Sequence, residues 1–228
     1  MHAFLLHADD VLRRRSWVTR ADGAASPFGH PLRWLAADVL VFGLLYGAVM
    51  GAFGGVLGDR AWQVLYSALK VPLLLLVTFF LGLPCFFVLN TLLGLRRDFA
   101  EALRALLAAQ AGLAIVLASL APLTAFWYVS SGDYQRALLF NGLMFAVASF
   151  AAQGLVRAYY RPLVARNRRH RWMLWTWLGL YIFVGIQMAW VLRPFVGSPD
   201  QPVQFIRPES WGNAYEVVLR LVWRAIVG

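Results

Sequence analysis

The sequence predicts an all-α, polytopic membrane helix bundle: five transmembrane helices plus an amphipathic helix near each terminus. Composition is the first observation, because 61% of the 228 residues are hydrophobic and only 14% are charged. Soluble domains carry roughly 45–50% apolar and about 25% charged residues. The mean hydropathy of +0.62 agrees with a membrane chain. This composition excludes a soluble globular enzyme, a disordered chain and a fibrous repeat.

The second observation is a set of apolar windows long enough to cross a bilayer, which takes about 20 residues. There are five: 35–57, 71–95, 105–129, 137–157 and 172–192. Each is expected to be helical, because a lone segment in lipid satisfies its backbone polar groups only within itself. The chain therefore divides into an N-terminal segment, 1–34, a five-helix bundle, 35–192, and a C-terminal region, 193–228.

The distribution of arginine and lysine predicts the orientation. Fourteen of the 21 basic residues fall in the N-terminal segment, the connection after the second window and the connection after the fourth. Cytoplasmic loops carry the excess of basic residues. A cytoplasmic N-terminus and an external C-terminus follow, with residues 157–171, which hold six arginines and no acid, as the strongest signal.

Both terminal regions contain candidate amphipathic helices. Residues 3–15 are predicted to form one on the membrane surface, with Phe4, Leu5, Val11 and Leu12 as its apolar side. Residues 22–27 are predicted to form a linker. At the other end, the sequence predicts a proline-rich loop over 193–209 and then an amphipathic helix over 210–227. That helix is expected to lie on the membrane or to pack on the spans. The sequence is compatible with two roles for that helix: it caps the bundle or it binds a partner.

A glycine ridge runs along the first window, where Gly43, Gly47, Gly51 and Gly55 recur every four residues. Small residues at this spacing let another helix backbone approach closely, and in lipid such packing drives association. Contact within the chain is the preferred interpretation. An interface with a second copy or another protein is the alternative.

Intramembrane polar residues are mostly amides and hydroxyls, whose usual role is hydrogen bonding between helices. Asn90, Asn141 and Gln153 also form a possible polar path. Pro84 and Gly82 make the second window a candidate for a broken helix of the transporter type. A packing kink is the simpler interpretation.

The external junction after the fifth window is the most specific part of the predicted surface. Arg193 and Pro194 follow the window directly, against the positive-inside trend, and Gln187 lies just before them. A partner explains such an arginine better than topology does, and the candidates are Asp133, Asp200, Glu209 or a lipid phosphate. A structural role is favoured over a binding site.

The sequence offers no catalytic, cofactor or metal site. Its histidines lie outside the window centres, Cys85 has no neighbouring ligands, and neither a phosphate loop nor a nucleophile elbow is present. The net charge of +10 is explained by arginines that flank spans and meet anionic headgroups, so nucleic-acid binding is not expected.

Three segments carry a family resemblance: residues 68–78 together with Pro84, residues 117–123, and residues 187–195. In these the chain resembles uncharacterised bacterial five-span membrane proteins that are Yip1-like in appearance. The resemblance implies five spans, no catalytic residues and a role in organising membranes, as in Yip1-type proteins that bind small GTPases. The tail from residue 193 departs from the Yip1 layout, which places a GTPase partner in doubt.

Together these observations predict a non-enzymatic membrane scaffold or accessory subunit that organises a membrane complex or lipid. The alternative is a small transporter or pore with an amide-lined path. Expected partners are membrane lipids, including anionic headgroups at the arginine-rich loops, and another membrane protein or a second copy. The expected location is the bacterial cytoplasmic membrane.

Overall fold

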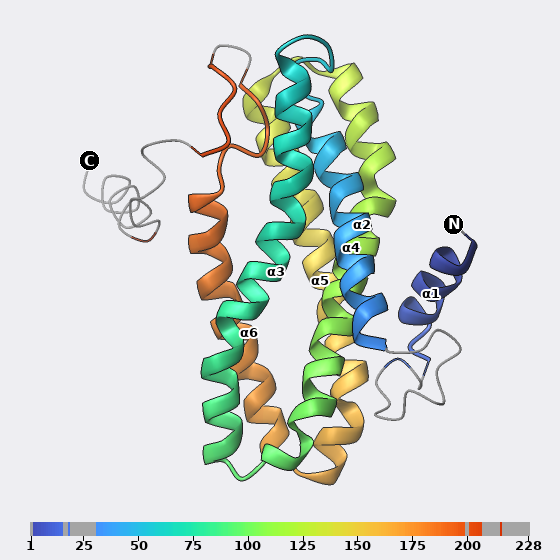
Figure 1. The fold of residues 1–228 in the computed structure, drawn as a ribbon, viewed down its shortest axis with the longest axis vertical. Coiled ribbons are helices and arrows are strands. Elements are labelled where there is room, and N and C mark those ends of the chain that lie inside the picture. Colours follow the sequence, from blue (N-terminus) through green and yellow to red (C-terminus); the bar gives the residue numbers. More distant parts are fainter. Residues whose placement is uncertain (1, 16–17, 19–30, 199–200, 207–214, 216–228) are drawn as a thin grey trace.

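The computed structural model describes residues 2–15, 18, 31–198, 201–206 and 215. Its helices are α1 (His2–Leu12), α2 (Pro31–Gly51), α3 (Arg60–Leu92), α4 (Phe99–Ser130), α5 (Tyr134–Arg166) and α6 (Arg169–Val191), with a 3-10 turn at Arg96–Asp98 (Figure 1). Helices α2 to α6 include the five spans that are long and apolar enough to cross a membrane. The predicted fold class is therefore confirmed. The predicted linker and C-terminal helix lie outside the described residues, Tyr215 apart.

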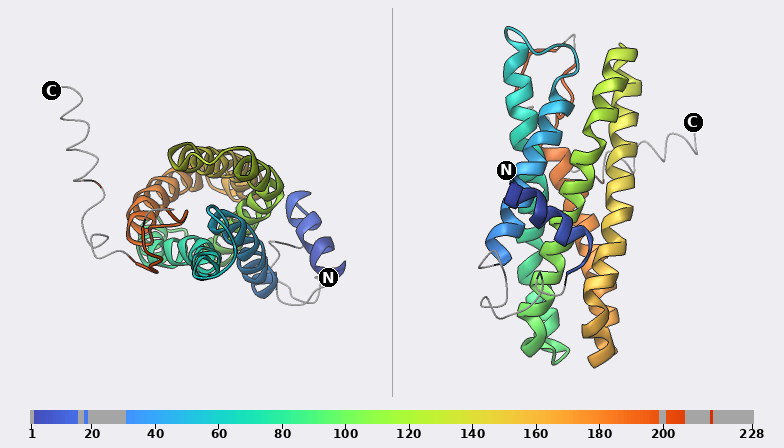
Figure 2. Two further views of the ribbon diagram at one scale, coloured as in Figure 1. Left: turned by 90° about the horizontal axis from the view of Figure 1, so that it is seen from above. Right: turned by 90° about the vertical axis from the view of Figure 1, so that its right-hand side faces the viewer.

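The five long helices run side by side, with α1 and α6 on opposite sides of the bundle (Figures 1 and 2). The α2–α3 loop, the α4–α5 connection and residues 193–198 lie at the top of Figure 1, here the upper end. The α3–α4 and α5–α6 connections lie at the lower end. At 32 or 33 residues, α3, α4 and α5 are each about 50 Å long. They extend beyond a hydrocarbon core of about 30 Å.

Several predicted boundaries differ from the observed helix ends, and two of these differences change the environment of residues discussed below. The first window ran to residue 57, but α2 ends at Gly51, and Gly54 and Gly55 have φ angles of +86° and +117°. These left-handed values suit glycine and do not continue a helix. The second window began at residue 71, but α3 begins at Arg60, so Lys70 lies within a helix rather than in a loop.

Helix α3 is also unbroken. It contains Pro72 and Pro84, yet remains helical from Arg60 to Leu92. The broken helix that Gly82 and Pro84 raised as a candidate is therefore absent, and the prolines are accommodated within a continuous span.

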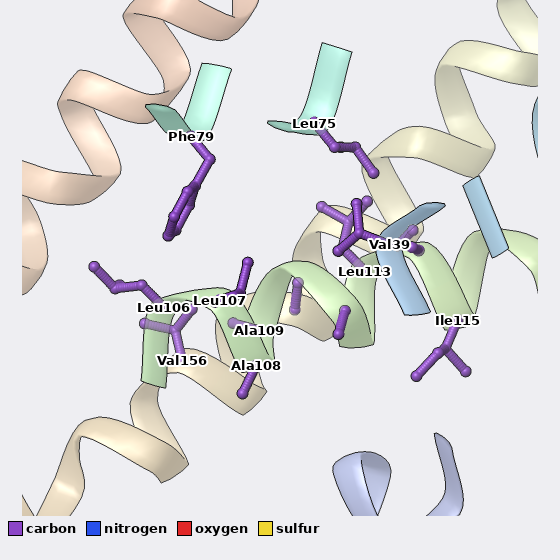
Figure 3. Packing of buried hydrophobic residues seen from close by; sticks show 14 of the residues in the cluster. Val39, Leu75, Phe79, Leu106, Leu107, Ala108, Ala109, Leu113, Ile115 and Val156 are labelled. Carbon is purple, nitrogen blue, oxygen red and sulfur yellow. The ribbon is translucent and has the colours of Figure 1, made fainter. Parts of the chain in front are cut away.

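Helix α4 forms the centre of the core. Nearly every residue from Ala105 to Leu117 is buried, and alanines make up much of this stretch. A helix that is apolar and buried all round is surrounded by other helices. In Figure 3, Leu106 of this stretch lies between Phe79 of α3 and Val156 of α5, whereas Leu113 lies toward Val39 of α2. Small side chains on α4 let α2 and α5 approach closely.

The glycine ridge packs against α3. A Cβ atom on Gly47 would lie 2.8 Å from the Cα of Ala68, and one on Gly51 would lie 2.8 Å from the Cα of Val64. At Gly43 the nearest atom is Pro72 Cβ at 3.2 Å. Gly55 was wrongly assigned to the ridge, because it lies beyond α2 and nothing surrounds its Cβ position. The ridge thus consists of three glycines, and they pack against a helix of the same chain.

Helix α1 docks on the bundle through only part of the predicted apolar face: Val11 is buried and Phe4 packs on Trp34. Leu5 is 59% exposed and Leu12 is 39% exposed, whereas His7, Ala8 and Val11 are buried. His7 Nδ1 lies 2.6 Å from an Asp38 carboxylate oxygen on α2. The Tyr159 hydroxyl of α5 donates to the Val11 carbonyl at 2.6 Å. Buried Val11 and these polar contacts together attach α1, whereas two leucines of its predicted apolar face point outward.

The close α2–α3 contact predicts that Gly47→Ala destabilises the protein. The added methyl group would clash with the α3 backbone and force the helices apart, and such overpacking costs about 1–3 kcal/mol. Thermal unfolding of the purified protein in detergent measures this as a lowered Tm. The matched control is Gly142→Ala on α5, where a Cβ meets nothing within 4 Å. Equal Tm values for the two variants would contradict the predicted importance of the ridge.

Candidate functional site

A polar face on α3 forms the upper-end site. Arg60, Gln63, Ser67 and Lys70 follow one another at intervals of three or four residues, which places them on one side of a helix. Gln63, Ser67 and Lys70 are at most 1% exposed. Buried polar groups are costly unless they are hydrogen-bonded, so this face requires partners.

The partners are backbone carbonyls of residues 193–198, here called the junction segment. The Lys70 ammonium donates to the Pro194 carbonyl at 2.6 Å, and the Gln63 amide donates to the Phe195 carbonyl at 3.2 Å. The Ser67 hydroxyl donates to the same Phe195 oxygen. Because α6 ends at Val191, these carbonyls have left the helical hydrogen-bond ladder, and α3 side chains satisfy them.

Further contacts hold the junction segment from other sides. Arg60 Nη1 donates to the Ser198 carbonyl at 2.8 Å, and the Tyr134 hydroxyl of α5 donates to the Val196 carbonyl at 3.4 Å. Val196 is fully buried. A Cβ on Gly197 would lie 2.7 Å from Gln63 Cγ, so the backbone lies directly against the α3 side chain. The segment is thus enclosed as part of the bundle.

The predicted junction residues occupy distinct environments. Pro194 is buried and its carbonyl binds Lys70. The Arg193 guanidinium lies 3.5 Å from the centre of the Trp190 ring, a cation–π contact. Gln187 is half-buried on α6, six residues earlier. Of the acids considered for Arg193, Asp133 pairs with Arg136 at 3.3 Å, and Asp200 and Glu209 lie outside the described residues.

The sequence interpretation missed the α3 side of this site. Lys70 lay just outside the predicted second window, 71–95, and Gln63 and Ser67 were not considered. A signal was present, because Lys70 is the only lysine in the chain and continues the helical spacing from Arg60. The hydrogen-bond partners of that polar face are backbone carbonyls. Every residue has a backbone carbonyl, so these partners cannot be recognised from the sequence.

The amides of the possible polar path are separated from one another. Asn141 accepts from the Tyr46 hydroxyl at 3.2 Å and donates to the Ala137 carbonyl at 2.8 Å and to the Tyr128 hydroxyl at 2.5 Å. These bonds join α2, α4 and α5. Gln153 is twelve residues further along α5, about 18 Å away along the helix axis. Asn90 is buried near the lower end of α3.

A charged network joins the helices at the lower end. Arg166 of α5 contacts Asp98 at 2.7 Å and Glu101 at 3.2 Å, and His170 Nε2 of α6 lies 3.0 Å from Asp98. The arginine and the imidazole stabilise the charged form of the Asp98 carboxylate. In the described part of the chain, no cluster of three or more His, Cys, Asp or Glu side chains could hold a metal ion. His30 lies outside that part.

Comparison with known proteins adds no assignment: no protein-family model, curated protein or solved structure matches this chain. The Yip1-like resemblance therefore rests on the three sequence segments alone.

The junction geometry predicts that Lys70→Met loosens the segment. The substitution keeps the volume of the side chain but removes the ammonium, and a hydrogen bond to a charged group contributes about 1.5–3 kcal/mol. We expect at least a tenfold faster reaction of a maleimide with the buried thiol introduced by Val196→Cys, in a Cys85→Ser background. Arg136→Met is the control, because it removes an exposed cation at the same end. Unchanged labelling after Lys70→Met would contradict the assigned role.

Proposed function

We propose that this chain is a non-enzymatic integral membrane scaffold or accessory subunit, and that α6 receives a transmembrane helix of a partner protein. The observation that carries the proposal is the exposure of α6. Only 6% of its apolar 18-residue window is buried inside the bundle, compared with 67% for the span that contains α4. Helix α6 packs along α3 and only sparsely along α5.

The outward face of α6 has the composition of a helix-docking surface. Trp172, Thr176, Gly179 and Phe183 recur at intervals of three or four residues, and all four are exposed. Nothing lies within 4 Å of the Cβ position of Gly179. A small residue at that point leaves room for a second helix backbone, as at other transmembrane helix contacts. At Phe183 the chain itself meets this face, because Tyr215 stacks on that ring with ring centres 4.7 Å apart. The partner helix is therefore placed over Trp172, Thr176 and Gly179.

The use of the buried polar groups supports a non-enzymatic role. Lys70 binds a backbone carbonyl, Asp38 contacts His7, and Asn141 joins three helices. Each of these groups holds one part of the chain to another. Catalytic groups, by contrast, need a reacting atom within hydrogen-bond distance.

Two sequence features suggested the alternative function, a small transporter or pore, and the structure favours neither of them. The broken helix on which it relied is a continuous α3. The amide side chains of the possible polar path are also separated from one another. Asn141 is engaged in hydrogen bonds between helices. A flux assay in liposomes remains the direct test of this alternative.

The arginine distribution supports placing the lower end in the cytoplasm. Residues 157–171, rich in arginine, form the lower part of α5, the α5–α6 connection and the start of α6. The junction segment then lies at the external end, as the positive-inside trend favours.

A substitution on the outward α6 face tests the scaffold proposal. We expect Gly179→Trp to leave the Tm of the purified protein unchanged, because open space surrounds that position. The same variant should lose a stoichiometric partner when native membranes are gently extracted and the intact particle is weighed by mass spectrometry. Gly142→Trp on the exposed side of α5 is the matched control and should keep the partner.

Two outcomes would overturn the proposal. One is a wild-type particle that contains this chain alone, without a partner protein. The other is a partner that remains bound to the Gly179→Trp protein and is equally abundant in the control.

A further inference from the structure

An apolar groove separates α5 from α6 in the middle of the bundle. Its volume is about 510 Å³, within the range of about 300–1,000 Å³ that holds small-molecule ligands. Leu74, Leu75 and Thr78 of α3 and Leu113 of α4 form its floor. Phe150 of α5, 83% exposed, and Ile182 of α6, 50% exposed, stand at its rim. The groove is therefore accessible from the lipid side of the bundle.

The groove continues toward the lower end into a second cavity of about 460 Å³. Gln153 and Leu178 line both cavities, so the two cavities adjoin each other. The lining then changes from apolar to basic: Arg157 and Arg161 of α5 and Arg171 of α6 surround the lower cavity. Trp175 lies beside them, a residue type enriched at the level of lipid headgroups.

These three arginines differ from Arg166 at the same end. Arg166 contacts Asp98 and Glu101. For Arg157, Arg161 and Arg171, no acidic partner is found within 4 Å in the residues that the structure describes. Three guanidinium groups around one cavity repel one another unless an anion lies among them, and arginine binds phosphate through paired hydrogen bonds.

We propose that this groove binds one anionic phospholipid, with its phosphate among Arg157, Arg161 and Arg171 and an acyl chain between α5 and α6. The dimensions agree. From Arg161 to Phe145 is sixteen residues, about 24 Å along the helix. One leaflet of the hydrocarbon core is about 15 Å thick, which leaves room for a headgroup region at the arginine end.

A lipid fits this site better than a free phosphate or a protein helix. Free phosphate would use only the basic cavity and leave the apolar groove unexplained. A second helix is about 10 Å across, whereas α3 and α4 side chains close the floor of a groove that lies between two neighbouring helices. An acyl chain is narrow and flexible enough to enter between them.

The lipid site goes beyond the proposed scaffold function and does not depend on it. Its α6 residues, such as Arg171, Leu178 and Ile182, lie on a different side of the helix from Gly179 and Phe183. One helix can therefore present a lipid groove on one side and a protein-facing surface on another.

Lipid titration of the full-length protein tests the inference. The protein is purified in neutral detergent and titrated with dioleoyl phosphatidylglycerol, with dioleoyl phosphatidylcholine or with inorganic phosphate, and bound lipid is counted by native mass spectrometry. We expect one phosphatidylglycerol to bind at least tenfold more tightly than phosphatidylcholine. The double variant Arg157→Gln/Arg161→Gln should lose this preference, since each arginine near the surface favours an anionic lipid.

Matched controls separate the site from general surface charge and from folding. Arg96→Gln/Arg97→Gln removes two exposed arginines at the same end but outside the groove, and it should keep the preference. Ser149→Trp fills the apolar groove and should weaken binding of both lipids, whereas Val147→Trp, on α5 outside the lining, should not.

Three results would overturn the inference. They are equal loss of preference in both arginine double variants, unchanged lipid binding after Ser149→Trp, and full occupation of the site by inorganic phosphate alone. The Gly179→Trp variant distinguishes the two proposals, because it should lose its protein partner and keep its lipid.

Discussion

The stretch of α3 from Gln63 to Pro72 is the contact on which the upper half of the structure depends. On one side the glycine ridge of α2 approaches its backbone so closely that a Cβ at Gly47 or Gly51 would clash. On another, Gln63, Ser67 and Lys70 bind carbonyls of the junction segment. A helix that is held by backbone contact and by buried hydrogen bonds has little freedom to shift, which fixes the position where α6 ends.

Several buried polar groups in this bundle connect elements that are distant in sequence. His7 with Asp38 attaches α1, Asn141 joins α2 to α4 and α5, and Lys70 attaches the junction segment. Away from water, an unpaired polar group costs free energy, so such pairs oppose alternative packings as well as stabilise the native one. In lipid, where apolar contact alone discriminates weakly between helices, these bonds and the small residues specify the arrangement.

The bundle is asymmetric. Helix α4 is enclosed, whereas α6 is attached mainly along α3 and leaves both an outward face and a groove toward α5. The proposed protein contact and the proposed lipid site both follow from this loose attachment. A helix that shares few contacts with one neighbour leaves space there, and in a membrane that space is filled by lipid or by another helix.

Apolar length and arginine placement determined, from the sequence alone, that this protein has five spanning helices and which loops are basic. That was possible because the bilayer imposes a minimum length on every span. The glycine spacing likewise indicated a close helix contact, but only the tertiary structure identified α3 as its partner and excluded Gly55. The α3 side of the junction and the α5–α6 groove were also decided by the tertiary structure. Both depend on which helices become neighbours, and the ligands of Lys70, Gln63 and Ser67 are backbone carbonyls, which every residue carries.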